Sequence, residues 1–184
     1  MQRIDFEVGA VATLRRRVAE VEGLNEDLVA FARGHAGAVS TIHDAVLAML
    51  PAETPDALAL VLAHEWPLIL RVDEVAFAWG NAEAAYRGDR DGVRPVEPRL
   101  IARMAEGLPP VSIRQVSRGH ALFAATCDSM RSEAIVRLDG AGGNGIIVLG
   151  QREEAAVDGR HGARLLRFLG STVSHMLDRW PPPL

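Results

Sequence analysis

The sequence contains no lysine: all 20 of its basic residues are arginine. A Walker phosphate-binding loop, a protein-kinase site and a Schiff-base enzyme each need a lysine amine at a defined position. These three classes of site are therefore excluded. Acidic residues outnumber basic residues by 24 to 20, which gives the chain a formal net charge of −4. Broad nucleic-acid binding rests on clustered cations that neutralise phosphates, so we expect no nucleic-acid partner.

Cysteine occurs once, at Cys127, which makes an intrachain disulfide and a multi-cysteine metal site impossible. This usage is typical of a reducing compartment, and we expect a cytoplasmic protein. A nucleophilic cysteine needs a base nearby, and His120 could approach it. We favour the simpler interpretation, in which Cys127 packs in the core as a small apolar side chain.

Long apolar runs are missing as well. No window reaches the roughly 18 apolar residues that a membrane-spanning helix needs. The first residues lack the cationic patch and apolar run of a signal peptide, so we expect neither export nor a membrane partner. The six histidines show no i, i+4 spacing among themselves, and we expect no metal site.

Residues 140–145 read Gly-Ala-Gly-Gly-Asn-Gly, a literal G-x-G-x-x-G. In a dinucleotide-binding fold this motif opens a helix, whose N-terminus receives the pyrophosphate. Here the next residues, 146–149, are Ile-Ile-Val-Leu and are typical of a strand. The run therefore predicts a hairpin turn, and we expect no bound cofactor.

The first fifty residues carry the clearest periodic pattern. Two series of mostly apolar residues recur seven apart, the spacing that keeps a seam facing a partner helix. Val11, Val18, Asn25, Ala32, Val39 and Val46 form one series, and Leu14, Val21, Leu28, His35, Ile42 and Met49 form the other. We expect one helix over about 11–33, a break near Gly34 and Gly37, and a second helix over about 38–50 that ends at Pro51.

Asn25 indicates what the first helix does. A buried amide among Val and Leu is costly unless it meets its own copy across a two-fold axis, where it specifies a parallel two-stranded coiled coil. We therefore predict a homodimer. The expected interface residues are Val11, Leu14, Val18, Val21, Asn25 and Leu28. The alternative is that this helix packs on its own domain.

The rest of the chain alternates between helical and strand patterns. Thr54, Pro55 and Asp56 are typical of a helix start, and Pro67 should end or kink that helix. Residues 80–94 are polar and contain glycine, which predicts a loop with at most a short strand. The other expected elements are a strand over 75–79, a helix over 98–106, a strand over 111–116, a hairpin of strands 134–138 and 146–149, and a helix over about 165–180.

Five stretches of this pattern are shared with a known family: residues 14–28, 42–47, 132–138, 145–152 and 165–170. They resemble a bacterial family catalogued as domain of unknown function 484, which is considered GAF-like. The resemblance spans nearly the whole chain. It implies an α+β fold, with helices packed on a six-stranded antiparallel sheet and a dimerising N-terminal helix. We accordingly expect a dimerisation segment at 1–37 and a GAF-like domain at 38–184.

The favoured function is a homodimeric, non-catalytic sensory or regulatory module. If it binds a small molecule, we expect the ligand over the sheet face next to Trp79, beneath the loops of residues 80–129, because ligand sites are concave and mostly apolar. Aromatic walls and polar groups come from Trp79, Tyr86, Arg114, His120, Phe123 and Cys127. An arginine such as Arg114 would suit an anionic ligand.

Two other functions remain open. In the first, the protein is a pure interaction scaffold, and Trp79 and Phe123 close the core and leave no cavity. In the second, it is an enzyme similar to the GAF-like sulfoxide reductases. Those look like multi-cysteine enzymes, and Cys127 has no resolving thiol in this chain. We therefore expect no catalytic residues.

Overall fold

The computed structural model describes residues 36–154 and 159–180. The chain divides into two units, Met1–Ser40 and Thr41–Leu184, and the second contains the sheet and the helices that cover it. The predicted dimer interface, from Val11 to Leu28, lies outside the described residues, as does the predicted helix over 11–33.

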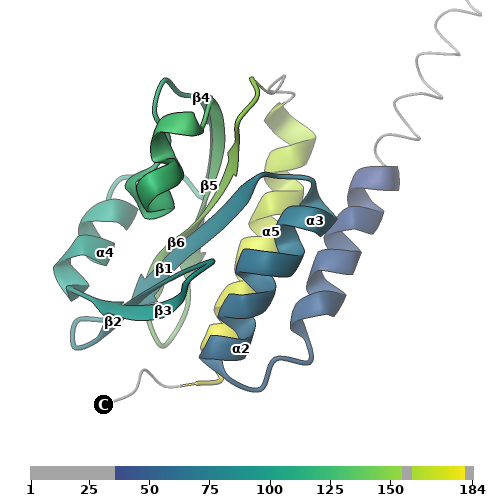
Figure 1. Ribbon diagram of the computed structural model, residues 1–184. Coiled ribbons are helices and arrows are strands. Elements are labelled where there is room, and N and C mark those ends of the chain that lie inside the picture. Colours follow the sequence, from purple (N-terminus) through teal and green to yellow (C-terminus); the bar gives the residue numbers. More distant parts are fainter. Residues whose placement is uncertain (1–35, 155–158, 181–184) are drawn as a thin grey trace, which may run out of the picture. The chain divides into compact units, whose positions relative to one another are not determined.

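Six strands form one antiparallel sheet, in the spatial order β3-β2-β1-β6-β5-β4 (Figure 1). Three consecutive strands build each half, and the central pair β1 and β6 joins the halves. This arrangement confirms the α+β fold with an antiparallel sheet and packed helices. The strands are β1 (Glu74–Gly80), β2 (Ala85–Asp89), β3 (Gly92–Val96), β4 (Val111–Gln115), β5 (Ser132–Asp139) and β6 (Asn144–Gln151).

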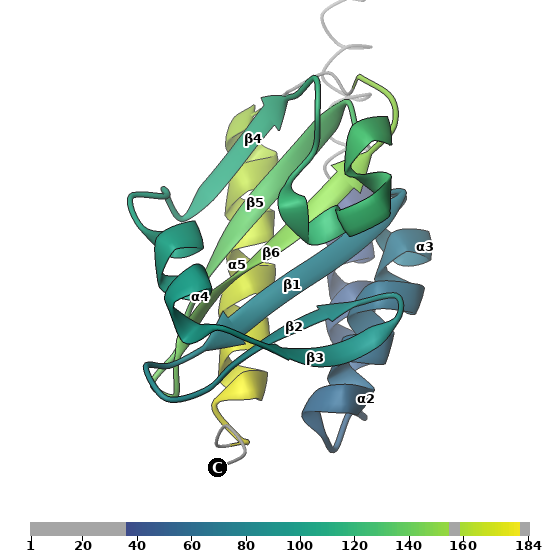
Figure 2. The same ribbon diagram turned by 60° about the vertical axis from the view of Figure 1, so that its left-hand side comes forward.

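The two faces of the sheet pack against different layers. Successive strand residues point to opposite faces, so on β1 the side chains of Val75, Phe77 and Trp79 join one core cluster. Ala76 and Ala78 join the other. Figure 2 shows α5, α2 and α3 behind the sheet and α4 in front of it. Because both faces are covered, all seven residues of β1 are buried.

The helical layer contains a helix over residues 36–49, a helical segment over 55–70, and α5 (Gly159–Leu177). The segment over 55–70 begins as predicted, since Oγ1 of Thr54 accepts a hydrogen bond from the Ala57 N–H at 3.1 Å. It runs as α2 (Pro55–Leu60), the π-helical turn η1 (Val61–Glu65) and α3 (Trp66–Leu70).

Pro67 was expected to end or kink this helix, and the structure shows that the helix does not end there. Proline has no N–H to donate, and its ring clashes with the carbonyl four residues before it in a regular helix. Here the turn ahead of it is wider: the Trp66 N–H bonds to the carbonyl of Val61, five residues back. A π-helical turn thus accommodates the proline, and the helix continues to Leu70.

The prediction of a loop over residues 80–94 was also wrong, because β2 and β3 pair as a hairpin there. β3 is the edge strand of the sheet, where Pro95 is tolerated since its missing N–H removes no ladder bond from a central strand. Gly88 lies directly opposite Phe77, and a Cβ at this position would collide with the Phe77 ring. The polar and glycine residues therefore suit a strand at the edge of this sheet.

The second half of the heptad pattern stabilises the domain itself. Ile42 and Met49 of the heptad series are buried in the core cluster on the helical side of the sheet, and Val46 packs against it. The indole N–H of Trp66 also donates to the Ala45 carbonyl at 3.0 Å. The heptad positions in residues 41–49 thus face their own core and not a partner helix.

The G-x-G-x-x-G run forms the turn between β5 and β6, as predicted. Its last glycine, Gly145, lies within β6, where a Cβ would collide with the Ala78 carbonyl oxygen on β1. Within residues 36–154 and 159–180, no helix is long and apolar enough to cross a membrane.

Candidate functional site

The six residues predicted to bind a ligand do not gather around one cavity. Trp79 and Tyr86 lie on the helical side of the sheet, with their ring centroids 5.3 Å apart. Phe123 and Cys127 are buried on the opposite side. A single site that contains all of them is therefore not formed, because the alternation along β1 turns Trp79 away from the loops that follow it.

The sheet face opposite the helices is covered by the chain itself. Its cover consists of α4 (Pro98–Ala105) and the 3₁₀-helical segment η2 (Ala121–Ser129). Phe123 and Met130 lie over Gly150, where a Cβ would be 2.6 Å from Phe123 Cζ and 2.8 Å from Met130 Sδ. The predicted ligand face is thus filled by apolar side chains of this segment.

Arg114 and His120 do meet, at a buried carboxylate. Glu133 on β5 is only 2% exposed. Its Oε1 accepts hydrogen bonds from Nε and Nη2 of Arg114, at 2.8 and 2.6 Å. Its Oε2 accepts from the His120 backbone N–H at 2.7 Å. The guanidinium that we expected to bind an anionic ligand therefore pairs with Glu133 within the fold.

The His120 ring serves as a cap for η2. Its Nδ1 accepts a hydrogen bond from the Leu122 N–H at 3.2 Å, which requires this nitrogen to be unprotonated. Burial lowers the pKa of His120 below its usual value; Glu133 opposes this shift and Arg114 adds to it. The neutral ring is thus the form that suits this position.

Cys127 packs in the apolar cluster beneath η2. Its Sγ lies 3.8 Å from Oδ1 of Asp128, and its carbonyl accepts from the Gly119 N–H. These contacts fit the interpretation of Cys127 as a small buried side chain.

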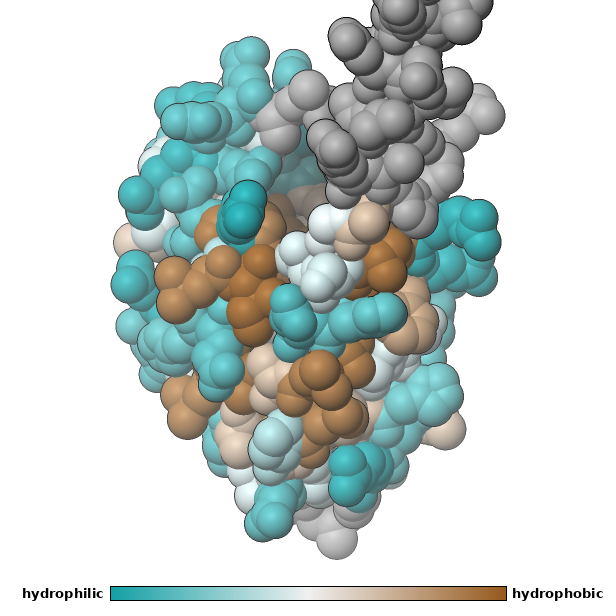
Figure 3. All heavy atoms as spheres, turned by 90° about the vertical axis from the view of Figure 1, so that its right-hand side faces the viewer, coloured by the Kyte–Doolittle hydropathy of each residue, from teal (hydrophilic) through white to brown (hydrophobic). Residues whose placement is uncertain are grey.

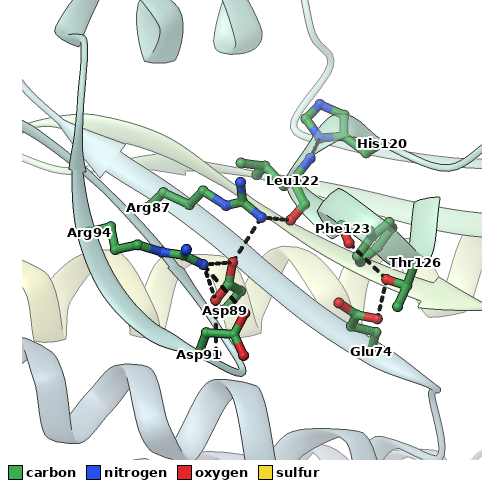
Figure 4. Close-up of polar contacts among 9 residues, drawn as sticks. All are labelled: Glu74, Arg87, Asp89, Asp91, Arg94, His120, Leu122, Phe123 and Thr126. Carbon is green, nitrogen blue, oxygen red and sulfur yellow. Dashed lines mark hydrogen bonds and ion pairs between the residues drawn. The ribbon is translucent and has the colours of Figure 1, made fainter.

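Two further strand carboxylates lie beneath η2, and Figure 4 shows how they connect to it. The Thr126 hydroxyl donates to Oε2 of Glu74 at 2.5 Å. Asp89 forms ion pairs with Nη2 of both Arg87 and Arg94, at 2.8 and 2.9 Å. The same Nη2 of Arg87 donates to the Leu122 carbonyl at 2.6 Å. Buried polar groups on β1, β2 and β5 therefore fix η2 to the sheet.

Ala124 is strained within this segment. Its backbone has φ 49° and ψ −114°, in a region that a residue with a Cβ rarely adopts. The residue lies between Phe123, which packs on the sheet, and Thr126, which bonds to Glu74. The contacts on both sides therefore offset a local strain of about 1–3 kcal/mol.

An open hollow of about 860 Å³ lies at one end of the sheet, beside α4. Four parts of the chain meet there: the end of β1, the start of α4, the glycine turn between β5 and β6, and the residues that follow α5 (Figure 2). The lining residues are Gly80, Asn81, Ala82, Pro98, Arg99, Ile101, Ala102, Gly140, Ala141, Gly142, Gly143, Asn144, Asp178 and Trp180.

The glycine turn gives the hollow its shape. A Cβ at Gly143 would lie 2.5 Å from the Gly80 carbonyl oxygen, so only glycine lets the turn lie this close to the end of β1. The carboxylate of Asp178 holds the turn from the other side, accepting from the N–H groups of Ala141 and Gly142 at 3.1 and 2.8 Å. On this side, the backbone of the glycine turn thus forms the wall of the hollow.

Among the described residues that line the hollow, Asp178 is the single carboxylate, and there is no histidine or cysteine. In the part of the chain that the structure describes, no three His, Cys, Asp or Glu side chains come together as metal ligands. The hollow instead combines small and apolar side chains with a few polar groups, which is typical of sites for organic molecules.

A family model described as "Protein of unknown function, DUF484" matches residues 2–182. The chain belongs to this family. The membership that the sequence predicted is thereby confirmed.

No curated protein matches this DUF484 chain. Two solved structures are similar to it. One is a GAF domain described as part of a sensor histidine kinase from Pseudomonas syringae pv. tomato, with 13% identity, 80% of this chain and 90% of that chain covered, and a TM-score of 0.49. The other is the N-acylhomoserine lactone-dependent LuxR-family transcription factor CepR2 from Burkholderia cenocepacia, with 16% identity, coverages of 77% and 93%, and a TM-score of 0.47.

The hollow of this DUF484 protein was not predicted from the sequence. The glycine run was singled out, but Asp178 follows Gly142 by 36 residues, and only the fold brings the two together. Arg99 and Trp180 were missed as well. A usable signal was the glycine run itself, since three glycines in a hairpin turn of this length leave backbone groups accessible.

Proposed function

We propose that this protein is a non-catalytic regulatory module that acts as a homodimer and binds a small organic molecule in the hollow at the end of the sheet. One observation carries the choice of site: the hollow is open, with a volume of about 860 Å³, whereas the face first considered is filled by Phe123 and Met130. Its volume lies in the range of sites for small molecules, roughly 300–1,000 Å³.

The floor and walls suit an organic ligand. Ile101 is buried at the base, and Pro98, Ala102 and Trp180 add apolar surface. Arg99 and Asp178 supply the charged groups. A mostly apolar lining with a few placed polar groups is what orients a small ligand.

The non-catalytic part of the proposal rests on what the described residues offer. The carboxylates on the sheet are engaged in ion pairs or hydrogen bonds that fix η2, and Cys127 is buried beside Asp128. None of these groups lines the hollow. The dimer rests on the heptad pattern from Val11 to Leu28, with Asn25 within it.

A pair of tryptophan variants tests the site. Ala102→Trp places an indole in the hollow, whereas Leu100→Trp places one on the same helix at an exposed position outside it. The full chain is screened for thermal stabilisation by nucleotides, amino acids and aromatic acids. We expect that a compound which stabilises the wild type loses its effect with Ala102→Trp and keeps it with Leu100→Trp. Stabilisation that survives Ala102→Trp would place the ligand elsewhere.

A second candidate is a protein-interaction scaffold, which the surface of the helical layer favours. Figure 3 shows apolar side chains gathered on that face. Five large apolar side chains of this layer are at least half exposed: Leu47, Leu50, Leu60, Leu68 and Phe168. A screen in which no compound stabilises the protein would favour the scaffold.

A further inference from the structure

The charges around the hollow indicate which class of molecule it accepts, an inference that rests on the function proposed above. Among the described residues that line the hollow, two carry a formal charge, Arg99 and Asp178. Their availability to a ligand differs. The hydrogen bonds that each already makes decide which of the two can bind a ligand.

Asp178 is already engaged. Its Oδ1 accepts from the Gly142 N–H at 2.8 Å and its Oδ2 from the Ala141 N–H at 3.1 Å. Each oxygen thus has a backbone donor, and the negative charge stabilises the turn. These two bonds use one acceptor site on each oxygen, and the N–H dipoles offset part of the negative charge. Asp178 is therefore a weaker counter-ion than a carboxylate without such donors.

Arg99 is available. It is exposed on the first turn of α4 and lines the hollow. Among the described residues, no carboxylate lies within ion-pair distance of its guanidinium, whereas Arg87, Arg94, Arg114 and Arg137 all pair with carboxylates. A guanidinium donates two parallel hydrogen bonds to a carboxylate or a phosphate, which are the strongest contacts it makes.

The apolar residues of the lining indicate the shape and polarity of the rest of the ligand. Ile101, Pro98 and Ala102 form an apolar wall on α4, and Trp180 also lines the hollow. Flat apolar groups pack well against an indole ring. We propose that the hollow binds an organic acid with a planar apolar body, whose anionic group is held by Arg99.

A matched pair of probes separates charge from shape. 2-Naphthoate and 2-naphthamide have the same bicyclic body, but only the first is an anion. Binding to the isotope-labelled full chain is followed by shifts of backbone amides in two-dimensional NMR. We expect the amides of the glycine turn and of α4 to move, and 2-naphthoate to bind about three- to fivefold more tightly, the gain expected from one exposed ion pair.

Variants assign that preference to one side chain. Arg99→Gln should reduce 2-naphthoate to the affinity of 2-naphthamide and leave 2-naphthamide unchanged. Arg103→Gln removes an exposed arginine of the same helix that does not line the hollow, and should change neither affinity. Added salt should weaken 2-naphthoate alone, because ions screen an exposed ion pair.

The outcomes distinguish the two proposals. Equal binding of both probes to the wild type would overturn the choice of an acid but leave the hollow as the site. A preference for 2-naphthoate that survives Arg99→Gln would overturn the role of Arg99. If neither probe shifts an amide around the hollow, both the inference and the proposed site are wrong.

Discussion

Phe123 packs against the centre of the sheet only because residue 150 is a glycine. The Phe123 ring is 2% exposed, and its Cζ would lie 2.6 Å from a Cβ at residue 150. Met130 Sδ would lie 2.8 Å from the same Cβ. Ordinary contacts of a Cβ begin near 3.4 Å. To reach 3.4 Å, Phe123 Cζ must move by about 0.8 Å from 2.6 Å and Met130 Sδ by about 0.6 Å from 2.8 Å in Gly150→Ala.

The expected change in the free energy of unfolding of Gly150→Ala follows from two opposing effects. Overpacking a well-packed core costs about 1–3 kcal/mol. Replacing glycine by alanine in a strand recovers about 0.5–1 kcal/mol of chain entropy. The net destabilisation should thus be about 1–2 kcal/mol. Urea unfolding of the full chain measures it, and we expect the slope of the unfolding free energy against urea concentration to stay unchanged.

A second substitution tests whether Phe123 causes this cost. Phe123→Leu leaves a space into which the new methyl group fits, so the double variant should be more stable than the sum of the single variants predicts, by about 1 kcal/mol. Gly162→Ala is the control: no atom lies within 4 Å of its added Cβ, and a helical glycine gains stability on this change. Additive effects of Gly150→Ala and Phe123→Leu would refute the packing described here.

Three other predictions concern the cap, the turn and the first helix. The pKa of His120 is lowered in the folded protein, mainly by burial. Its contribution to stability is therefore fully present above the unfolded value of about 6.5 and is lost as the pH falls from there towards the lowered folded pKa. Between about pH 7.5 and about pH 5, the free energy of unfolding in urea should fall less for His120→Asn than for the wild type. Asp178→Asn should cost less than about 1 kcal/mol, because the site is exposed, but should speed hydrogen exchange of the Ala141 and Gly142 amides; unchanged exchange would contradict the role of this carboxylate. Asn25→Val should raise the unfolding midpoint and yield mixed oligomers in sedimentation, whereas a monomeric wild type at micromolar concentration would disprove the predicted dimer.

The elements that were predictable depend on local chemistry. The cap at Thr54, the buried strand β1 and the glycine hairpin each follow from a few neighbouring residues. The hairpin of β2 and β3 was missed because its pairing with β1 and its edge position determine which residues it tolerates. The helix continues past Pro67 because the turn ahead of it is wider, and the residue types alone do not predict that turn.

The site was less predictable than the fold, for a geometric reason. Trp79 and Phe123 were placed together because both border the long connecting region. Strand alternation sends Trp79 to the helical side, and η2 brings Phe123 to the other. The hollow depends on contacts between residues far apart in the sequence, such as Gly143 with Gly80 and Asp178 with the glycine turn. Such contacts become visible only when the sheet is assembled.

The location of a bound ligand tests the central claim most directly. Crystals of the full chain, soaked with a set of aromatic acids and their amides, would show where a small molecule binds. We predict density in the hollow bounded by Arg99, Trp180 and the glycine turn, with Phe123 still packed on Gly150. Density between η2 and the sheet, with Phe123 displaced and the hollow empty, would contradict the proposed site.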